Sequence, residues 1–211
     1  MNKPFFSFIL SILIISCSPT ESESEKPKNT MEADDAMYYY QIPDYPSGYN
    51  AGTVAARVVD GLGFRFFHAT DSLTEENLQF RPMEEARTME ETIDHILGLT
   101  RITYNAVMKQ PTDFSIEHPE LTFAEKRMQI LEYIRKSSEV LRKSTAEDLD
   151  TYPIVFLYPD GNKGEYPFWN LLNGPIADAL WHTGQVVTFR RSAGNPFNSK
   201  ASVLRGKVRE E

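Results

Sequence analysis

The stretch TMEETIDHILGLTRITYNAVMK, residues 88–109, decides the fold class, because a helix start and a helical apolar stripe occur in it together. Thr88 and Glu91 have the spacing of a capping box, in which each side chain accepts a hydrogen bond from the other residue's backbone N–H. His95 and Leu99 follow on one helical face. The stretch therefore predicts a helix that begins just after Thr88 and runs to about residue 109.

The segment upstream, residues 53–72, has apolar side chains at helical spacing. They predict a helix that buries this stripe in the core. The stripe consists of Val54, Val58, Leu62 and Phe66, and is widened by Val59 and Phe67.

Two more helices are expected downstream. A second capping box, Thr122 with Glu125, predicts one at about residues 123–144. The last helix should begin near Pro167, bend at Gly174-Pro175 and stop at Gly194. Together these patterns predict an all-α fold, a four-helix bundle with long irregular connections.

Two connecting segments are rich in aromatic residues. Residues 38–49 contain five tyrosines among proline and glycine, and we expect them to lie against the domain in extended form or to cover a cleft. Residues 152–166 contain the Asp160-Gly161 turn and are expected to form a long loop or an irregular hairpin.

The N-terminus predicts export and lipid attachment. Residues 1–16 carry one charge, Lys3, and an apolar run too short to span a bilayer, which is typical of a signal peptide. Cys17, the only cysteine, follows a small residue and resembles the lipidated cysteine of a bacterial lipoprotein. Residues 17–35 should be a flexible tether, and residues 36–211 one domain. The expected location is the cell envelope, lipid-anchored, at the outer membrane of a Gram-negative bacterium.

The charge balance argues against nucleic-acid binding. The formal net charge is −8, and loss of Lys3 with the signal peptide would lower it to −9. Affinity for nucleic acids rests largely on Lys and Arg that neutralise phosphates. A small molecule is the more plausible partner, beside the membrane that the anchor would reach, and a homodimer is left open.

Three polar residues of the last helix share one stripe: Asp178, His182 and Gln185, at i, i+4 and i+7. A divalent cation bound by Asp178 and His182 would offset the cost of desolvating them. His95 of the stretch above could supply a third ligand. The alternatives are a surface Asp-His pair and a core histidine bonded to Glu91. His68 and His118 are expected to be exposed, although His68 could approach a cleft, and Tyr104 and Trp181 could be pocket walls.

With these stretches in place, the chain resembles the DinB/YfiT-like family of putative metalloenzymes over about residues 49–196. The resemblance implies an up-down-down-up bundle and a divalent cation held by His95, Asp178 and His182, with Asp178 standing where histidine is commoner. It leaves the metal open among Zn, Ni, Fe and Mn. The matching motifs are Leu73-Thr74-Glu75-Glu76 to Arg81-Pro82, Glu91-Thr92-Ile93-Asp94-His95-Ile96, and Asp178-x-x-x-His182-x-Gly184-Gln185 to Gly194-Asn195-Pro196.

The family includes thiol transferases and thiol-dependent isomerases. The resemblance therefore favours a metal-dependent transferase or hydrolase that acts on a small molecule at the cell envelope, with Gln185 and Glu91 orienting ligands or water. The alternative is a lipid-anchored binding or scaffold protein without catalysis.

Overall fold

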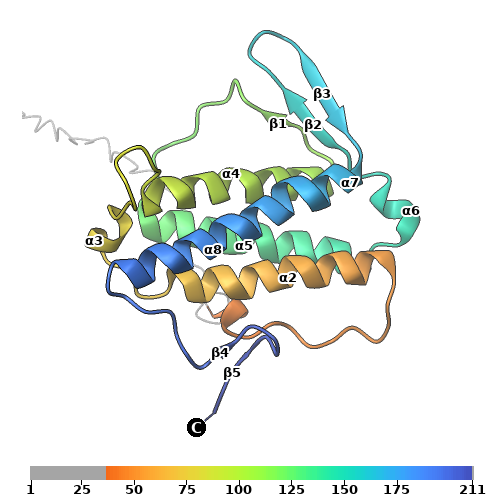
Figure 1. The fold of residues 1–211 in the computed structure, drawn as a ribbon. Coiled ribbons are helices and arrows are strands. Elements are labelled where there is room, and N and C mark those ends of the chain that lie inside the picture. The colour runs from red at the N-terminus through yellow and green to blue at the C-terminus, as the bar shows by residue number, and fades with distance from the viewer. Residues whose placement is uncertain (1–36, 211) are drawn as a thin grey trace, which may run out of the picture. The chain divides into compact units, whose positions relative to one another are not determined.

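The computed structural model describes residues 37–210, which are mostly helical (Figure 1). The predicted signal peptide, Cys17 and the tether lie outside these residues. None of the described helices combines the length and the apolar character needed to cross a bilayer. The longest are α2 (Ala51–Thr70), α4 (Met89–Val107), α5 (Phe123–Lys143) and α8 (Ala177–Ser192); the short ones are η1 (Tyr38–Tyr40), α3 (Glu75–Leu78), α6 (Ala146–Leu149), α7 (Phe168–Leu171) and η2 (Leu172–Ile176).

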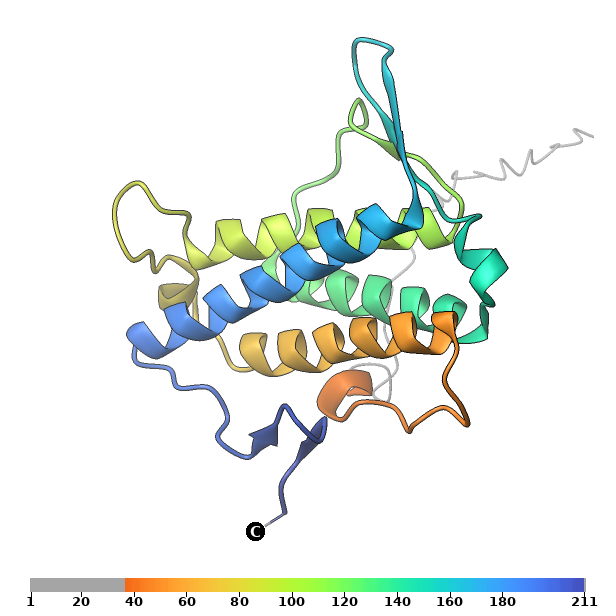
Figure 2. The same cartoon turned by 45° about the vertical axis from the view of Figure 1, so that its right-hand side comes forward.

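The long helices pack in neighbouring pairs. Helix α2 lies against α5 and α8, and α4 lies against the same two helices. Figures 1 and 2 show that α2 and α8 run in one direction and that α4 and α5 run in the other. Because α4 and α5 are consecutive and run the same way, the chain must return along the domain between them.

The prediction of an all-α fold is wrong in one respect, because the described residues also contain short strands. In the first sheet, β1 pairs in parallel with β2, and β2 pairs antiparallel with β3, with Ile154 opposite Tyr166. The hairpin considered for residues 152–166 is thus present. Strands of two residues carry no periodic pattern, so the others were missed. The strands are β1 (Thr112–Asp113), β2 (Ile154–Leu157), β3 (Lys163–Tyr166), β4 (Ala201–Ser202) and β5 (Lys207–Val208).

Helix α2 buries most of the predicted stripe, namely Val59, Leu62, Phe66 and Phe67, but exposes the two valines of its first half. Val54 is 51 % exposed and Val58 is 42 % exposed. Gly52 lies against the end of α5, and a Cβ added to it would lie 2.1 Å from the carbonyl oxygen of Ser144. Apolar periodicity counts valines but not glycines, so it missed the face at which the two backbones approach most closely.

The tyrosine-rich segment does lie against the domain, but η1 is a short helical turn rather than extended. Tyr39 is buried, and its hydroxyl donates to Oδ1 of Asp60 at 3.1 Å. His68 is also buried, and its Nε2 donates to the carbonyl of Tyr40 at 3.0 Å. The expectation that His68 is exposed is therefore wrong. The turn at residues 38–40 covers it.

The predicted helix ends are confirmed. Both capping boxes form, at Thr88 with Glu91 and at Thr122 with Glu125. The last helix bends where it was expected to, because Pro175 lies in the π-type turn η2 between α7 and α8.

The far end of α8 is held by Arg190, which is only 4 % exposed. Its Nη1 donates to the carbonyls of His68 and Ala69, in the last turn of α2, at 2.8 and 3.0 Å. Its Nε and Nη2 donate to the carbonyl and the side-chain oxygen of Asn195. Asn195 in turn donates to the carbonyl of Ser72. One guanidinium thus joins the ends of α2 and α8.

We expect Arg190→Ala to lower the free energy of unfolding by about 2–4 kcal/mol, because it leaves several buried oxygens without a donor. Arg191→Ala is the matched control, since Arg191 is exposed and occupies the next position of the same helix. It should change stability by less than about 0.5 kcal/mol. Urea unfolding of both variants measures the difference. Equal losses would contradict the role given to Arg190.

Candidate metal centre

Three predicted ligands come together between α4 and α8. His95 belongs to the second turn of α4, whereas Asp178 and His182 occupy successive turns of α8. One potential ligand atom of each residue lies within 4.8 Å of the other two. The i, i+4 spacing on α8 and the packing of α4 beside it thus produce one cluster.

Each histidine approaches one oxygen of the Asp178 carboxylate, at distances that are compatible with ligands of one ion. His95 Nε2 lies 3.4 Å from Oδ2 of Asp178, and His182 Nε2 lies 3.3 Å from Oδ1. Charge-assisted hydrogen bonds are shorter, about 2.7–2.9 Å. Ligand atoms bonded to one tetrahedral ion at about 2.0–2.2 Å lie roughly 3.3–3.6 Å apart. The donor set, two imidazoles and one carboxylate, suits a first-row divalent cation.

Gln185 orients one of the imidazoles. Nδ1 of His182 lies 2.8 Å from Oε1 of Gln185. With that oxygen as acceptor, Nδ1 carries the proton and Nε2 keeps its lone pair towards Asp178. This is the arrangement in which a histidine binds a metal through Nε2.

The cluster lies at the edge of the helix pair rather than in the core. The side chains of His95, Asp178 and His182 are 35, 39 and 16 % exposed. The fully buried face of α8 is formed by neighbouring residues such as Ala179 and Thr183. The expectation of an inward-facing carboxylate is therefore only partly met, and solvent can reach the cluster.

The π-type turn before α8 affects the direction in which Asp178 and His182 point. The π-type turn Leu172–Ile176 ends two residues before Asp178, and Gly174 within it has non-helical dihedral angles. Pro175 has no N–H to donate, so regular hydrogen bonding is interrupted there. A π-type turn also changes the direction in which the following side chains point. It thereby contributes to the alignment of Asp178 and His182 with α4.

The surroundings of His95 lower the pKa of its imidazole. Burial is the largest cause, the neighbouring Arg87 and His182 act in the same direction, and Asp178 opposes them. A lowered pKa favours the deprotonated imidazole, which is the form that binds metals.

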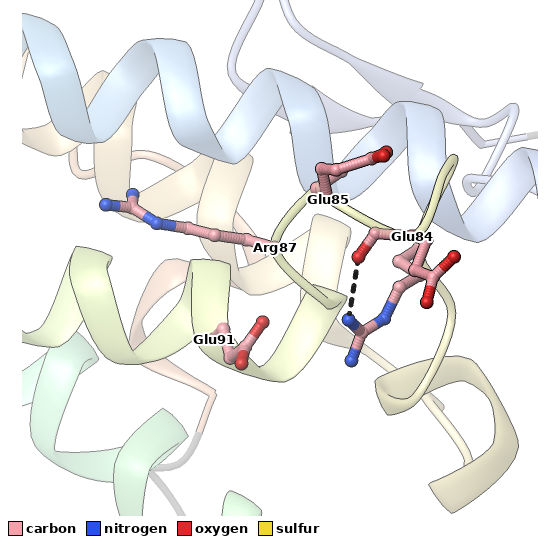
Figure 3. A pocket seen from close by; sticks show the side chains of 6 residues that line it. Glu84, Glu85, Arg87 and Glu91 are labelled. Atoms are coloured by element: carbon pink, nitrogen blue, oxygen red, sulfur yellow. Dashed lines mark hydrogen bonds between the residues drawn. The ribbon is translucent and has the colours of Figure 1, made fainter.

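A hollow of about 430 Å³ opens beside the start of α4 (Figure 3). Glu91, predicted to orient a ligand, lies on its wall. The Glu91 carboxylate accepts a hydrogen bond from the Thr88 N–H at 2.7 Å, so its role in the structure is to cap the helix. The lining residues are Arg81, Glu84, Glu85, Ala86, Arg87 and Glu91.

Tyr104 and Trp181, which were predicted as possible pocket walls, and His118 lie outside the cluster of metal-ligand candidates. Tyr104 stacks on Tyr133, with ring centroids 4.9 Å apart. Trp181 is 73 % exposed, and His118 is exposed as expected. Neither Tyr104 nor Trp181 lines this hollow.

A second hollow, of about 530 Å³, escaped the sequence analysis. It is mainly apolar and lies where α2 begins, next to α6 and α7. Val54, Val58 and Trp169 belong to its wall and are exposed. Sequence patterns assign such apolar residues to the core by default.

Comparison of the chain with protein-family models, with curated proteins and with solved structures gives no match.

Proposed function

We propose that the domain is a four-helix bundle of the DinB-like type that binds one divalent cation through His95, Asp178 and His182. The observation that carries the proposal is the convergence of these side chains from α4 and α8 at ligand spacing. Three protein ligands leave at least one coordination position open to water or substrate. The partial exposure of the cluster provides access to that position.

The carboxylate affects which ion is preferred. Two imidazoles and one carboxylate form a harder ligand set than three histidines, which favours Fe(II) or Mn(II) more than three histidines would. Zn(II) and Ni(II) still bind such sites through their intrinsic affinity.

The activity that we propose is a metal-dependent transfer or hydrolysis reaction on a small molecule. When bound, the cation would supply Lewis acidity, lowering the pKa of water or of a thiol, or polarising a carbonyl. His182 would be held in register by Gln185, and Asp178 would keep both imidazoles directed at one point. The hollow at Arg87 and Glu91 would accept the rest of the substrate.

Metal binding is tested with variants of Asp178. The purified wild-type domain should bind one divalent cation and gain roughly 2–3 kcal/mol of stability at about a hundredfold excess over Kd. Asp178→Ala should weaken binding by more than about a hundredfold, because even residues that only orient ligands are worth about 10–100-fold. Asp178→His should retain a metal and shift its preference. Calorimetric titration with Zn(II), Mn(II) and Fe(II) measures all three proteins.

Asp94→Ala is the matched control for this titration. Asp94 precedes His95 directly, but its carboxylate pairs with Lys126 at 2.7 Å. Its removal should leave metal affinity unchanged. Equal affinity in wild type and Asp178→Ala would remove Asp178 from the centre.

Catalysis is tested by reacting 2-mercaptoethanol with 1-chloro-2,4-dinitrobenzene in the presence of the metal-loaded protein. We expect acceleration that falls to the uncatalysed rate in His95→Ala, since loss of this ligand disrupts the centre. His118→Ala, which changes an exposed histidine outside the cluster, should remain active.

A metal-loaded wild type without any acceleration would speak for the second candidate, a lipid-anchored binding protein. The apolar hollow at Val54 and Trp169 favours that candidate, because it could take an uncharged apolar ligand.

We also propose that the chain is a lipoprotein anchored through Cys17 in the cell envelope, at the outer membrane of a Gram-negative bacterium. The support is the short apolar run that precedes the only cysteine. Cys17→Ser should move the full chain from the detergent phase to the aqueous phase and abolish labelling by a radioactive fatty acid. Unchanged partitioning and labelling would show that Cys17 carries no lipid.

A further inference from the structure

The apolar hollow at Val54 and Trp169 is a concave site separate from the candidate metal centre. Its wall comes from the start of α2, the residues just before it, and the segments around α6 and α7. Figures 1 and 2 show that these elements meet at the end of the helices where α2 begins. None of His95, Asp178 and His182 lines this hollow. A molecule bound in it would therefore not be a ligand of the metal.

The wall of the apolar hollow combines buried and exposed side chains. Ala55 and Phe168 belong to the wall and are also part of the buried core. Val54 and Val58, one helical turn apart on α2, remain exposed, and Trp169 is 74 % exposed. A ligand that covered these three side chains would remove apolar surface from water, which favours binding.

The size of the apolar hollow suits a small organic molecule. Its volume of about 530 Å³ lies within the range of about 300–1,000 Å³ that is usual for small-molecule pockets. Such pockets are mostly apolar and have few polar groups, as this one does. A concave site of this size fits a small molecule better than a flat bilayer surface.

The charges on the wall argue against an anionic ligand. No Lys, Arg or His of residues 37–210 lines the hollow, and Asp150 supplies its one charged side chain. Among the same residues the Asp150 carboxylate has no hydrogen bond or ion pair. The start of α2 reaches the hollow as well, but Asn50 already caps it by accepting a hydrogen bond from the Thr53 N–H at 2.8 Å. An anion would lose water here without gaining a cationic partner, and Asp150 would repel it.

We infer that the apolar hollow binds an uncharged apolar organic molecule and discriminates against anions of the same shape. Val54, Val58 and Trp169 supply the contact surface, and Asp150 disfavours anions. A cation is disfavoured as well, because one exposed carboxylate offsets little of the cost of desolvating it. The inference rests on the second candidate function, a binding protein, whose ligand class it names. It makes no use of the metal.

Two fluorescent probes with the same ring system test the inference. N-phenyl-1-naphthylamine is uncharged, and 8-anilino-1-naphthalenesulfonate differs from it by one sulfonate. The full chain carries Trp181→Phe, which leaves Trp169 as its only tryptophan and does not alter the hollow. The neutral probe should bind and accept excitation energy from Trp169. The anionic probe should bind roughly threefold to tenfold more weakly, and the difference should shrink in high salt.

Substitutions in the wall locate the site. Val54→Asp should weaken binding of the neutral probe roughly tenfold or more, because the ligand would have to desolvate a new charge. Val203→Asp is the matched control, since Val203 is also an exposed valine but lies outside the hollow. Asp150→Asn should bring the affinity for the anionic probe close to that for the neutral one. The N-terminal apolar run is the same in all these proteins, so differences between them report the hollow.

Each failure has a distinct result. Equal affinity for the neutral probe in Val54→Asp and Val203→Asp, or no energy transfer from Trp169, overturns the site. Anionic probe that binds as tightly as the neutral one overturns the ligand class. A dimer that Val54→Asp converts to a monomer in analytical ultracentrifugation makes a second copy of the chain the occupant and also overturns the inference.

The metal centre is assessed separately in the same variants. Val54→Asp leaves His95, Asp178 and His182 in place, so its titration with Zn(II) should match that of wild type. Loss of probe binding with unchanged metal affinity therefore supports the site in the apolar hollow. Loss of both in Val54→Asp shows that the variant is misfolded or that the sites are not separate, and it overturns the independence inferred here.

Discussion

The hydrogen bonds of the Arg190 guanidinium determine where the last helix lies. Helix carbonyls in the final turn have no partner within the helix, and here two carbonyls of α2 are satisfied by a side chain of α8. A buried cation is costly unless its donors are used, and four hydrogen bonds use the donors of Arg190. Sliding α8 along α2 would break these bonds together. The axial position of α8 is therefore restricted to one arrangement.

The opposite end of α8 is determined by Pro175. The π-type turn lets α7 and α8 follow one another without continuous helical hydrogen bonding, and Asp178 begins the regular part. Helix α4 has its own defined start at the Thr88 capping box. With both helices positioned by their ends, His95 meets Asp178 and His182 at ligand distance, although about eighty residues separate them in the chain.

The partial exposure of His95, Asp178 and His182 lowers the cost of placing three polar side chains beside the core. Fully buried, one carboxylate and two imidazoles would need compensation for lost hydration, whether or not a metal were bound. At the edge of the helix pair they keep part of their water, while residues such as Ala179 and Ile96 fill the core behind them. The same exposure lets a ligand approach.

Local chemistry in the sequence was sufficient to predict the long helices, their capped starts and the bend at Pro175, because these features depend on residues only a few positions apart. It was also sufficient to place Asp178, His182 and Gln185 on one stripe. The second helix offered His95 as a possible third ligand, and the family resemblance favoured that choice over a core histidine. The strands of two residues and the apolar hollow left no such local pattern.

Only the tertiary structure decided which faces meet. It exposed Val54 and Val58 at the second hollow, brought α2 close to α5 at Gly52, and buried His68 beneath the turn at Tyr40. It also placed Arg190 among backbone carbonyls of another helix. Such contacts join residues distant in sequence. They depend on how closely two backbones approach and on hydrogen bonds to backbone carbonyls. Every residue carries such a carbonyl, so the pattern of side chains in the sequence does not reveal which carbonyls are used.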